Sequence, residues 1–127
     1  MDEITLTLPR ERAFYGIAHL VVAGLGARLD LTVEHLDDLQ LALESLLWQR
    51  GDGDVSVVLR ALDDEIEAEI GPFDGALRED LEREPGADVG LRRVLETVVD
   101  QVGVSERDGG DWVRLRKTIR PVPASAG

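Results

Sequence analysis

The sequence contains no cysteine. This absence excludes disulfides, thiol nucleophiles and thiolate metal sites together. The two histidines, His19 and His35, lie in different expected helices, and neither has a ligand partner at a suitable spacing. We therefore expect no metal site.

Basic residues are scarce, with 14 Lys and Arg against 26 Asp and Glu and a net charge of -12. Nonspecific binding to nucleic acid or to anionic membranes needs clustered Lys and Arg, so we expect neither partner. An acidic surface instead fits a basic protein partner. The chain also lacks an apolar run approaching about 20 residues, and it opens with an acidic pair rather than a signal peptide. A cytoplasmic protein is expected.

Hydrophobic periodicity predicts five strands and four helices. Strands are expected at 3–8, 55–62 and 65–71, followed by two strands within 103–119. Helices are expected at 10–29, 33–50, 76–84 and 89–102. The inward faces of the first two helices are predicted to hold the following residues: Phe14, Ile17, Leu20, Val21 and Leu25, then Leu36, Leu39, Leu43, Leu46 and Leu47.

This order predicts an α+β fold, a two-layer sandwich in which helices cover one face of a mixed, mainly antiparallel five-stranded sheet. Residues 1–119 form one domain in this prediction. The Pro- and Ala-rich residues 120–127 are expected to be a flexible tail.

Three segments resemble the histidine-kinase-like (Bergerat) ATPase fold: "DLQLALESLLWQ" (38–49), "GLRRVLETVVDQVGV" (90–104) and "RDGGDWVRLRK" (107–117). The resemblance covers roughly residues 3 to 119 and is strongest to the anti-sigma-factor serine kinases. Members of that type bind ATP with magnesium and phosphorylate a serine on an anti-anti-sigma protein. They also sequester a sigma factor, usually as dimers. The resemblance further implies a binding surface on the first helix and around the nucleotide pocket.

The first nucleotide motif of that family is a Glu followed four residues later by an Asn, both on one face of a helix. The Asn amide oxygen helps to hold the magnesium on the phosphates. Glu44 matches the first position, but Trp48 occupies the second. An indole has one N–H donor and no oxygen for a cation, and the whole chain contains no asparagine. We expect the Trp48 ring to fill the site that water and magnesium would need.

The second motif is an Asp after the third strand that reads the adenine amino group. Strand alternation places Ile70 at this position, since Ile66, Ala68 and Ile70 share the inward face. A shift by one residue would offer Glu69 but would turn the apolar face outward. We therefore prefer Ile70, which is followed by Gly71.

The third motif is a pair of glycines whose backbone amides meet the phosphates at a helix N-terminus. Gly86 and Gly90 are spaced four residues apart rather than two. The intervening lid is short and acidic, and its carboxylates would repel a triphosphate. These carboxylates are Glu79, Asp80, Glu82 and Glu84.

Other chemistry finds little support. The carboxylates at 37–38 are adjacent on one expected helix and do not face each other, and those at 63–64 lie in an expected turn, so both pairs are expected to be solvated. No serine lies in a G-x-S-x-G elbow. The leading hypothesis is thus a non-catalytic regulator with a vestigial nucleotide pocket at Glu44, Trp48, Ile70, Gly71, Gly86 and Gly90. It would bind a protein such as a sigma factor or an anti-anti-sigma protein, without a cofactor. The alternatives are an active ATP- and magnesium-binding serine kinase with unusual ligands, and a homodimeric scaffold.

Overall fold

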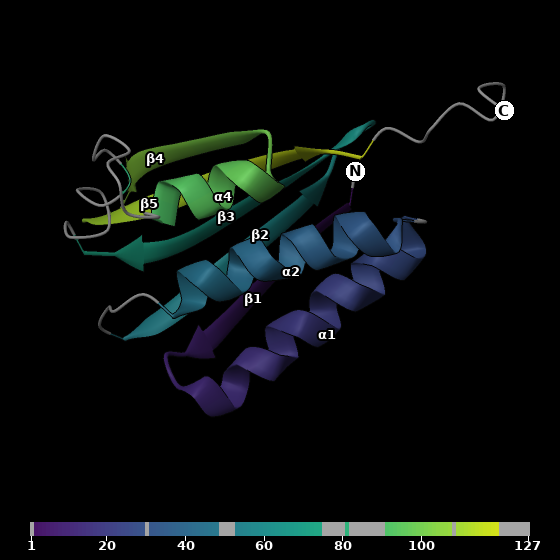
Figure 1. Ribbon diagram of the computed structural model, residues 1–127. Coiled ribbons are helices and arrows are strands. Elements are labelled where there is room, and N and C mark those ends of the chain that lie inside the picture. The colour runs from purple at the N-terminus through teal and green to yellow at the C-terminus, as the bar shows by residue number, and fades with distance from the viewer. Residues whose placement is uncertain are drawn as a thin grey trace, which may run out of the picture.

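The computed structural model describes residues 2–29, 31–48, 53–74, 81, 91–107 and 109–119. Figure 1 shows the elements in space. Their order and bounds are β1 (Asp2–Pro9), α1 (Arg12–Arg28), α2 (Val33–Leu47), β2 (Asp54–Ala61), β3 (Glu65–Phe73), α4 (Leu91–Val98), β4 (Gln101–Arg107) and β5 (Gly110–Thr118). The helix expected at 76–84 and the tail at 120–127 lie outside the described residues, apart from Leu81.

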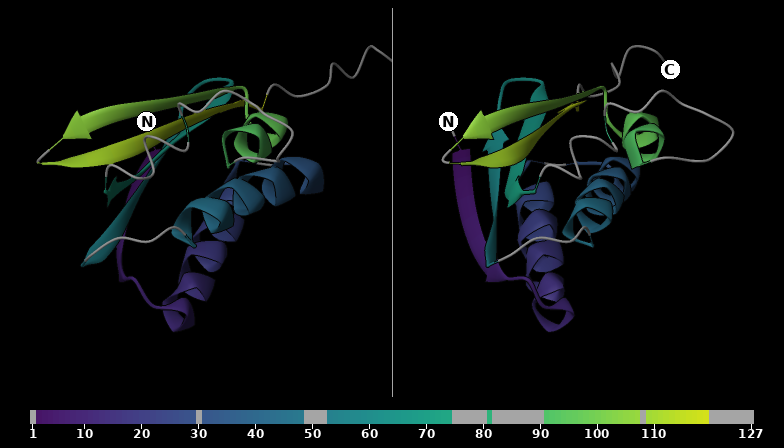
Figure 2. Two further views of the ribbon diagram at one scale, coloured as in Figure 1. Left: turned by 60° about the vertical axis from the view of Figure 1, so that its left-hand side comes forward. Right: turned by 90° about the vertical axis from the view of Figure 1, so that its left-hand side faces the viewer.

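The five strands form one sheet in the order β1-β2-β3-β5-β4. Helices α1, α2 and α4 all lie on one face of it (Figures 1 and 2). The α+β two-layer sandwich is therefore confirmed. All four pairings between the described strands are antiparallel, so the expectation of a mixed sheet was wrong for this part of the chain.

Several element boundaries differ from the prediction by a few residues, most of all the end of α4. Helix α4 ends at Val98, whereas the sequence predicted a helix to residue 102. The chain turns at Asp100, whose backbone N–H donates to the Arg116 carbonyl at 2.9 Å. Its carboxylate accepts from the backbone N–H of Thr118 at 2.5 Å, which lowers the pKa of Asp100. Strand β3 continues to Phe73, two residues past its expected end at residue 71.

The core lies between the helices and the sheet, and alternate strand residues enter it. Val57, Ile70 and Val113 are neighbours in register on β2, β3 and β5, and each is at most 2% exposed. On α2, four of the five predicted inward leucines are buried. These are Leu39, Leu43, Leu46 and Leu47.

The predicted inward face of α1 was partly wrong. Ile17 is 41% exposed and Leu20 is 74% exposed, while Ala18, Val22, Leu25 and Gly26 are the buried residues. Small side chains face inward because α2 packs closely against α1. A Cβ atom on Gly26 would lie 3.1 Å from Leu36 Cδ1. Since α1 is apolar on nearly every side, its periodicity did not identify the inward face.

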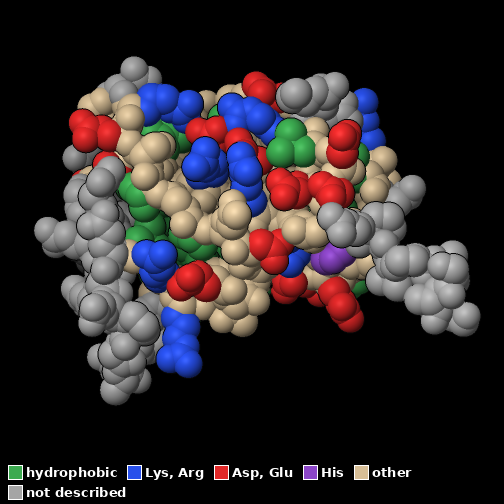
Figure 3. All heavy atoms as spheres, turned by 90° about the horizontal axis from the view of Figure 1, so that it is seen from above, with side chains coloured by type: hydrophobic (Ala, Val, Ile, Leu, Met, Phe, Trp, Pro, Cys, Tyr) green, Lys and Arg blue, Asp and Glu red, His purple; other side chains and the backbone are tan. Residues whose placement is uncertain are grey.

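None of the described helices lies on the opposite face of the sheet, and a row of alternating charges crosses that face. Glu3, Arg60, Glu67 and Arg116 are neighbours in register on β1, β2, β3 and β5. Arg60 donates to Glu3 at 2.8 Å and to Glu67 at 2.9 Å, and Arg116 donates to Glu67 at 2.9 Å. Acidic and basic side chains therefore lie side by side on this face (Figure 3). The row compensates the charge of Glu67, which is only 8% exposed.

Glu69 extends this network toward β4, since Arg107 donates to it at 3.0 Å and Arg60 also pairs with it. Burial alone would raise the pKa of Glu69. The hydrogen bond and charge of Arg60, with the charges of Arg107 and Arg114, outweigh burial and hold this pKa below its usual value. The hydrogen bonds to Glu69 and Glu3 in turn raise the pKa of Arg60.

We expect the Glu69 interactions to make stability depend on pH. A carboxylate with a lowered folded pKa contributes stability that is present above its unfolded pKa, about 4.3, and is lost as pH falls through the folded pKa. Glu69→Gln should therefore be less stable at neutral pH and lose less unfolding free energy on acidification below about pH 5. Urea unfolding across this range measures both effects. Glu106→Gln, exposed on edge strand β4, is the control and should retain the wild-type pH dependence. An unchanged acid sensitivity in Glu69→Gln would contradict this account.

Candidate functional site

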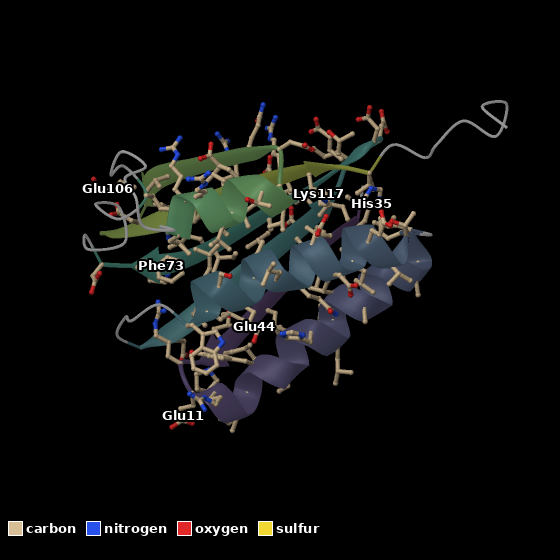
Figure 4. All side chains as sticks on the ribbon, in the orientation of Figure 1. Glu11, His35, Glu44, Phe73, Glu106 and Lys117 are labelled. Carbon is tan, nitrogen blue, oxygen red and sulfur yellow. The ribbon has the colours of Figure 1, made fainter. Side chains whose placement is uncertain are left out.

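Glu44 and Trp48 lie together on the flank of α2 that faces α1. Glu44 Oε2 is 4.0 Å from His19 Nε2 on α1, and both side chains are more than one-third exposed. Figure 4 shows Glu44 extending from α2 toward α1. The guanidinium carbon of Arg12 lies 4.1 Å from the centroid of the Trp48 ring. The helical spacing thus brings the two predicted positions together, where they meet basic groups of α1.

Trp48 does not fill a closed cavity, which corrects the packing expected for it. Its side chain is 49% exposed and stacks on Arg12. The residue is also the C-cap of α2, where its backbone N–H donates to the Glu44 carbonyl at 3.1 Å. An indole here gains from contact with the cation and covers the end of the helix while remaining open to water.

Ile70 is fully buried on the helix side of β3, with 0% exposure. It belongs to the same core cluster as Phe73, Leu81 and Leu95. Leu81 comes from the segment between β3 and α4, and its carbonyl accepts a hydrogen bond from Arg92 of α4 at 2.9 Å. Apolar side chains before this segment (Phe73), within it (Leu81) and after it (Leu95) therefore belong to the same core as Ile70. A buried isoleucine has no polar atom with which to read a nucleobase.

Gly71 lies on the face of the sheet away from the helices. A Cβ atom there would lie 2.7 Å from Cδ2 of Trp112, so the indole requires the glycine. The structure consequently does not bring Gly71 together with Glu44 and Trp48. Gly86 and Gly90, and the acidic lid residues, lie outside the described residues.

Asp111 is a buried carboxylate that the sequence reading did not single out. It is 9% exposed and pairs in register with Phe73 at the same end of the sheet as Ile70. The sequence indicated that Asp111 is buried, because Asp111, Val113 and Leu115 are every second residue of β5 and therefore share its inward face. Among the described residues, Asp111 is thus the buried acid closest in strand register to Ile70, the position expected to recognise the base.

The other end of the helix layer is held by Lys117, the only lysine of the chain. Its ammonium donates to the Val98 carbonyl at 2.7 Å and to Asp38 Oδ2 at 3.0 Å. Lys117 is 8% exposed and lies near His35 at this end (Figure 4). It therefore ties β5 to both α2 and α4, and its cation is compensated where it is buried.

A surface hollow of about 220 Å³ lies between α2 and α4. Its lining residues are Leu41, Arg93, Val94, Thr97 and Val98. Glu44, Trp48 and Ile70 do not line it, and its volume is below the roughly 300–1,000 Å³ typical of small-molecule sites. Among the described residues, no group of three His, Asp or Glu side chains could hold a metal ion, and no helix is long and apolar enough to cross a membrane.

Comparison with known proteins supports the fold. No protein-family model matches the chain, and no curated protein matches it. The crystal structure of the RsbU and RsbW domains of Rv1364c from Mycobacterium tuberculosis is similar, with a TM-score of 0.67 and 13% sequence identity. The match covers 96% of this chain and 34% of that chain, so this chain spans about a third of its neighbour's length. At this identity the likeness establishes a shared fold.

We expect the site of Ile70 to behave as closed core. Ile70→Asp should unfold the protein or cost more than about 3 kcal/mol, because it buries a carboxylate at a site lined by apolar residues. Ile70→Val removes one methyl group and should cost only about 0.5–1.5 kcal/mol. Chemical denaturation of both variants measures the difference. A well-folded, nearly wild-type Ile70→Asp protein would show instead that a polar, hydrated pocket exists there.

Proposed function

We propose that this chain is a non-catalytic regulator that uses an anti-sigma-kinase-like fold to bind a protein partner. The burial of Ile70 carries this proposal, because an apolar core side chain occupies the position at which the fold would otherwise recognise adenine. Trp48 supports it, because the helix end that would hold magnesium carries a ring stacked on Arg12. Without phosphoryl transfer, such a protein acts by stoichiometric occupancy of its partner.

The proposed partner is a sigma factor or an anti-anti-sigma protein, or another component of transcriptional or stress control. We place its contact over α2 and α4, around the hollow that Leu41 and Val94 line. Leu41 is 46% exposed, and the acidic side chains Glu34, Asp37 and Glu44 are exposed along the same helix. An apolar hollow beside acidic groups fits a partner with apolar side chains and a basic rim.

One observation favours an ATP-binding serine kinase as a second candidate. Asp111 supplies a buried carboxylate next in register to Phe73, and such a group could accept a hydrogen bond from an adenine amino group. In that case nucleotide binding would depend on Asp111 rather than on a residue of β3.

Thermal unfolding with magnesium and ATP separates these two functions. A nucleotide that binds with micromolar affinity should stabilise the protein by about 4 kcal/mol at millimolar concentration, which raises the melting temperature by several degrees. We expect no shift for the wild type. We also expect none for Trp48→Asn, because Ile70 remains. A shift that Asp111→Asn abolishes would establish the kinase alternative and overturn the non-catalytic function.

Partner capture by the immobilised chain tests the binding function. We expect stoichiometric capture that weakens as salt is raised, because the acidic surface attracts a basic partner. Leu41→Glu should lose this capture, while Val33→Glu should keep it, since Val33 is exposed on α2 away from the hollow. Capture that requires ATP, or that Leu41→Glu leaves intact, would contradict the proposed surface.

A further inference from the structure

Strand β4 forms one edge of the sheet, and among the described strands it pairs only with β5 (Figures 1 and 2). The backbone N–H and C=O groups of alternate β4 residues therefore point outward, away from β5. The other edge strand, β1, begins with the charged pair Asp2 and Glu3 and ends at Pro9, which are residue types that discourage further pairing. From Gln101 to Ser105, β4 has neither a proline nor a charged side chain. Its sequence therefore does not prevent pairing with a further strand.

The face of the sheet away from the helices is basic along β5 and β4. Arg114 and Arg116 of β5 point to this face, and Arg107 of β4 joins them. The acidic residues of these two strands, Glu106 and Asp111, are partners in register and belong to the helix side. In a chain of net charge -12, these two strands thus present three arginines and no carboxylate on one face.

The three arginines retain N–H groups for a further ligand. Arg107 pairs with Glu69 and Arg116 pairs with Glu67, yet the two arginine side chains remain 42% and 39% exposed. Arg114 is exposed, and among the described residues no carboxylate forms an ion pair with it. Each guanidinium has five N–H donors, so this face can bind additional carboxylates.

Gly103 leaves Arg114 accessible from the outer edge of β4. The two residues are partners in register, and Arg114 Nη2 lies 3.9 Å from the position that a Cβ atom of Gly103 would take. That distance is an ordinary van der Waals contact, so the fold of one chain does not require glycine there. A glycine inside a strand weakens it and often marks a site where another backbone approaches closely. A strand beside β4 supplies that reason, because it would lie next to the guanidinium of Arg114.

The helix side of β4 is apolar. Val102 and Val104 are partly buried and pack against the core. A strand added beside β4 would place every second residue on the arginine face and the residues between them next to these valines. The matching sequence is therefore acidic at alternate positions and apolar at the positions between.

We propose that the outer edge of β4 binds an extended segment of a protein partner in which acidic and apolar residues alternate. The segment pairs with the β4 backbone as an additional strand, its carboxylates bind Arg107 and Arg114, and its apolar side chains pack beside Val102 and Val104. A second copy of β4 fits less well, because it would bring its own arginines to the same face. A nucleic acid has no backbone that can continue the sheet. The site does not include the hollow between α2 and α4, and it is independent of nucleotide binding.

Titration with a fluorescent synthetic peptide, followed by anisotropy, tests the site. The probe is blocked at both ends, has the length of β4, which is 7 residues, and alternates Glu with Val. It should bind saturably, and more weakly as salt is raised. A peptide of the same composition, with its Glu and Val residues in separate blocks, should bind about tenfold more weakly, because it cannot match both faces. Equal binding of the two peptides would indicate unspecific charge attraction and overturn the proposal.

Variants of the full chain test the named contacts. Arg114→Gln should weaken peptide binding about tenfold, because it removes the arginine beside Gly103. Arg28→Gln is the matched control, since it removes the same charge from an exposed position at the end of α1 and should bind like the wild type. Gly103→Val should also weaken binding, because its side chain separates Arg114 from the peptide, although valine favours a strand. Thermal unfolding verifies that the three variants are folded. An Arg114→Gln protein that binds as tightly as the wild type overturns the proposal.

Amide hydrogen exchange locates the bound peptide. Binding should slow exchange within Gln101–Arg107 and leave Asp2–Pro9, the other edge strand, unchanged. A probe with proline at its centre should not bind, because proline has no N–H to donate to β4. Protection of β4 that rises with protein concentration without peptide would place a second copy at this edge. Binding of an oligouridylate, but not of the peptide, would assign the arginines to nucleic acid. Either of these two outcomes overturns the proposal.

Discussion

The alternation along β3 is the constraint on which the rest of the structure depends. This strand is central in the sheet, and it sends Ile66, Ala68 and Ile70 into the core while Glu67 and Glu69 point to the open face. Both faces of β3 are stabilised in this register. The isoleucines pack under the helices, and the glutamates pair with arginines of β2, β4 and β5. A shift by one residue would expose the first set and bury the second without partners. The strand therefore has one register.

That register bears directly on function. With Ile70 fixed inward, Glu65, Glu67 and Glu69 all point to the open face, so no acidic residue of β3 reaches the helix side of the sheet. At the C-terminal end of α2, Trp48 contacts Arg12 of α1, and Glu44 approaches His19 of α1. These two side chains of α2 thereby join it to α1. The proposed regulator thus keeps a rigid scaffold and presents helix surfaces on it.

The sequence predicted what depends on local alternation and not what depends on neighbouring elements. The strands and the inward leucines of α2 were predicted because one side of each is polar. The inward face of α1 was mispredicted because Ile17 and Leu20 are as apolar as the buried Val22 and Leu25. The helical pattern through Gln101 and Val102 yielded to their pairing with β5. Helical spacing placed Glu44 beside Trp48, but the stacking on Arg12 is a tertiary contact that no local pattern encodes. The alternation along β5 indicated that Asp111 points inward, but Asp111 was not among the predicted site residues.

We propose that this fold has lost its nucleotide site. Backbone amide NMR spectra of the full chain, recorded with increasing magnesium and ATP, test it at the residues concerned. We expect the amides of Glu44, Trp48, Ile70 and Gly71 to keep their chemical shifts at millimolar nucleotide. Saturable shifts at these amides of α2 and β3 would show that the site binds nucleotide and would contradict the account.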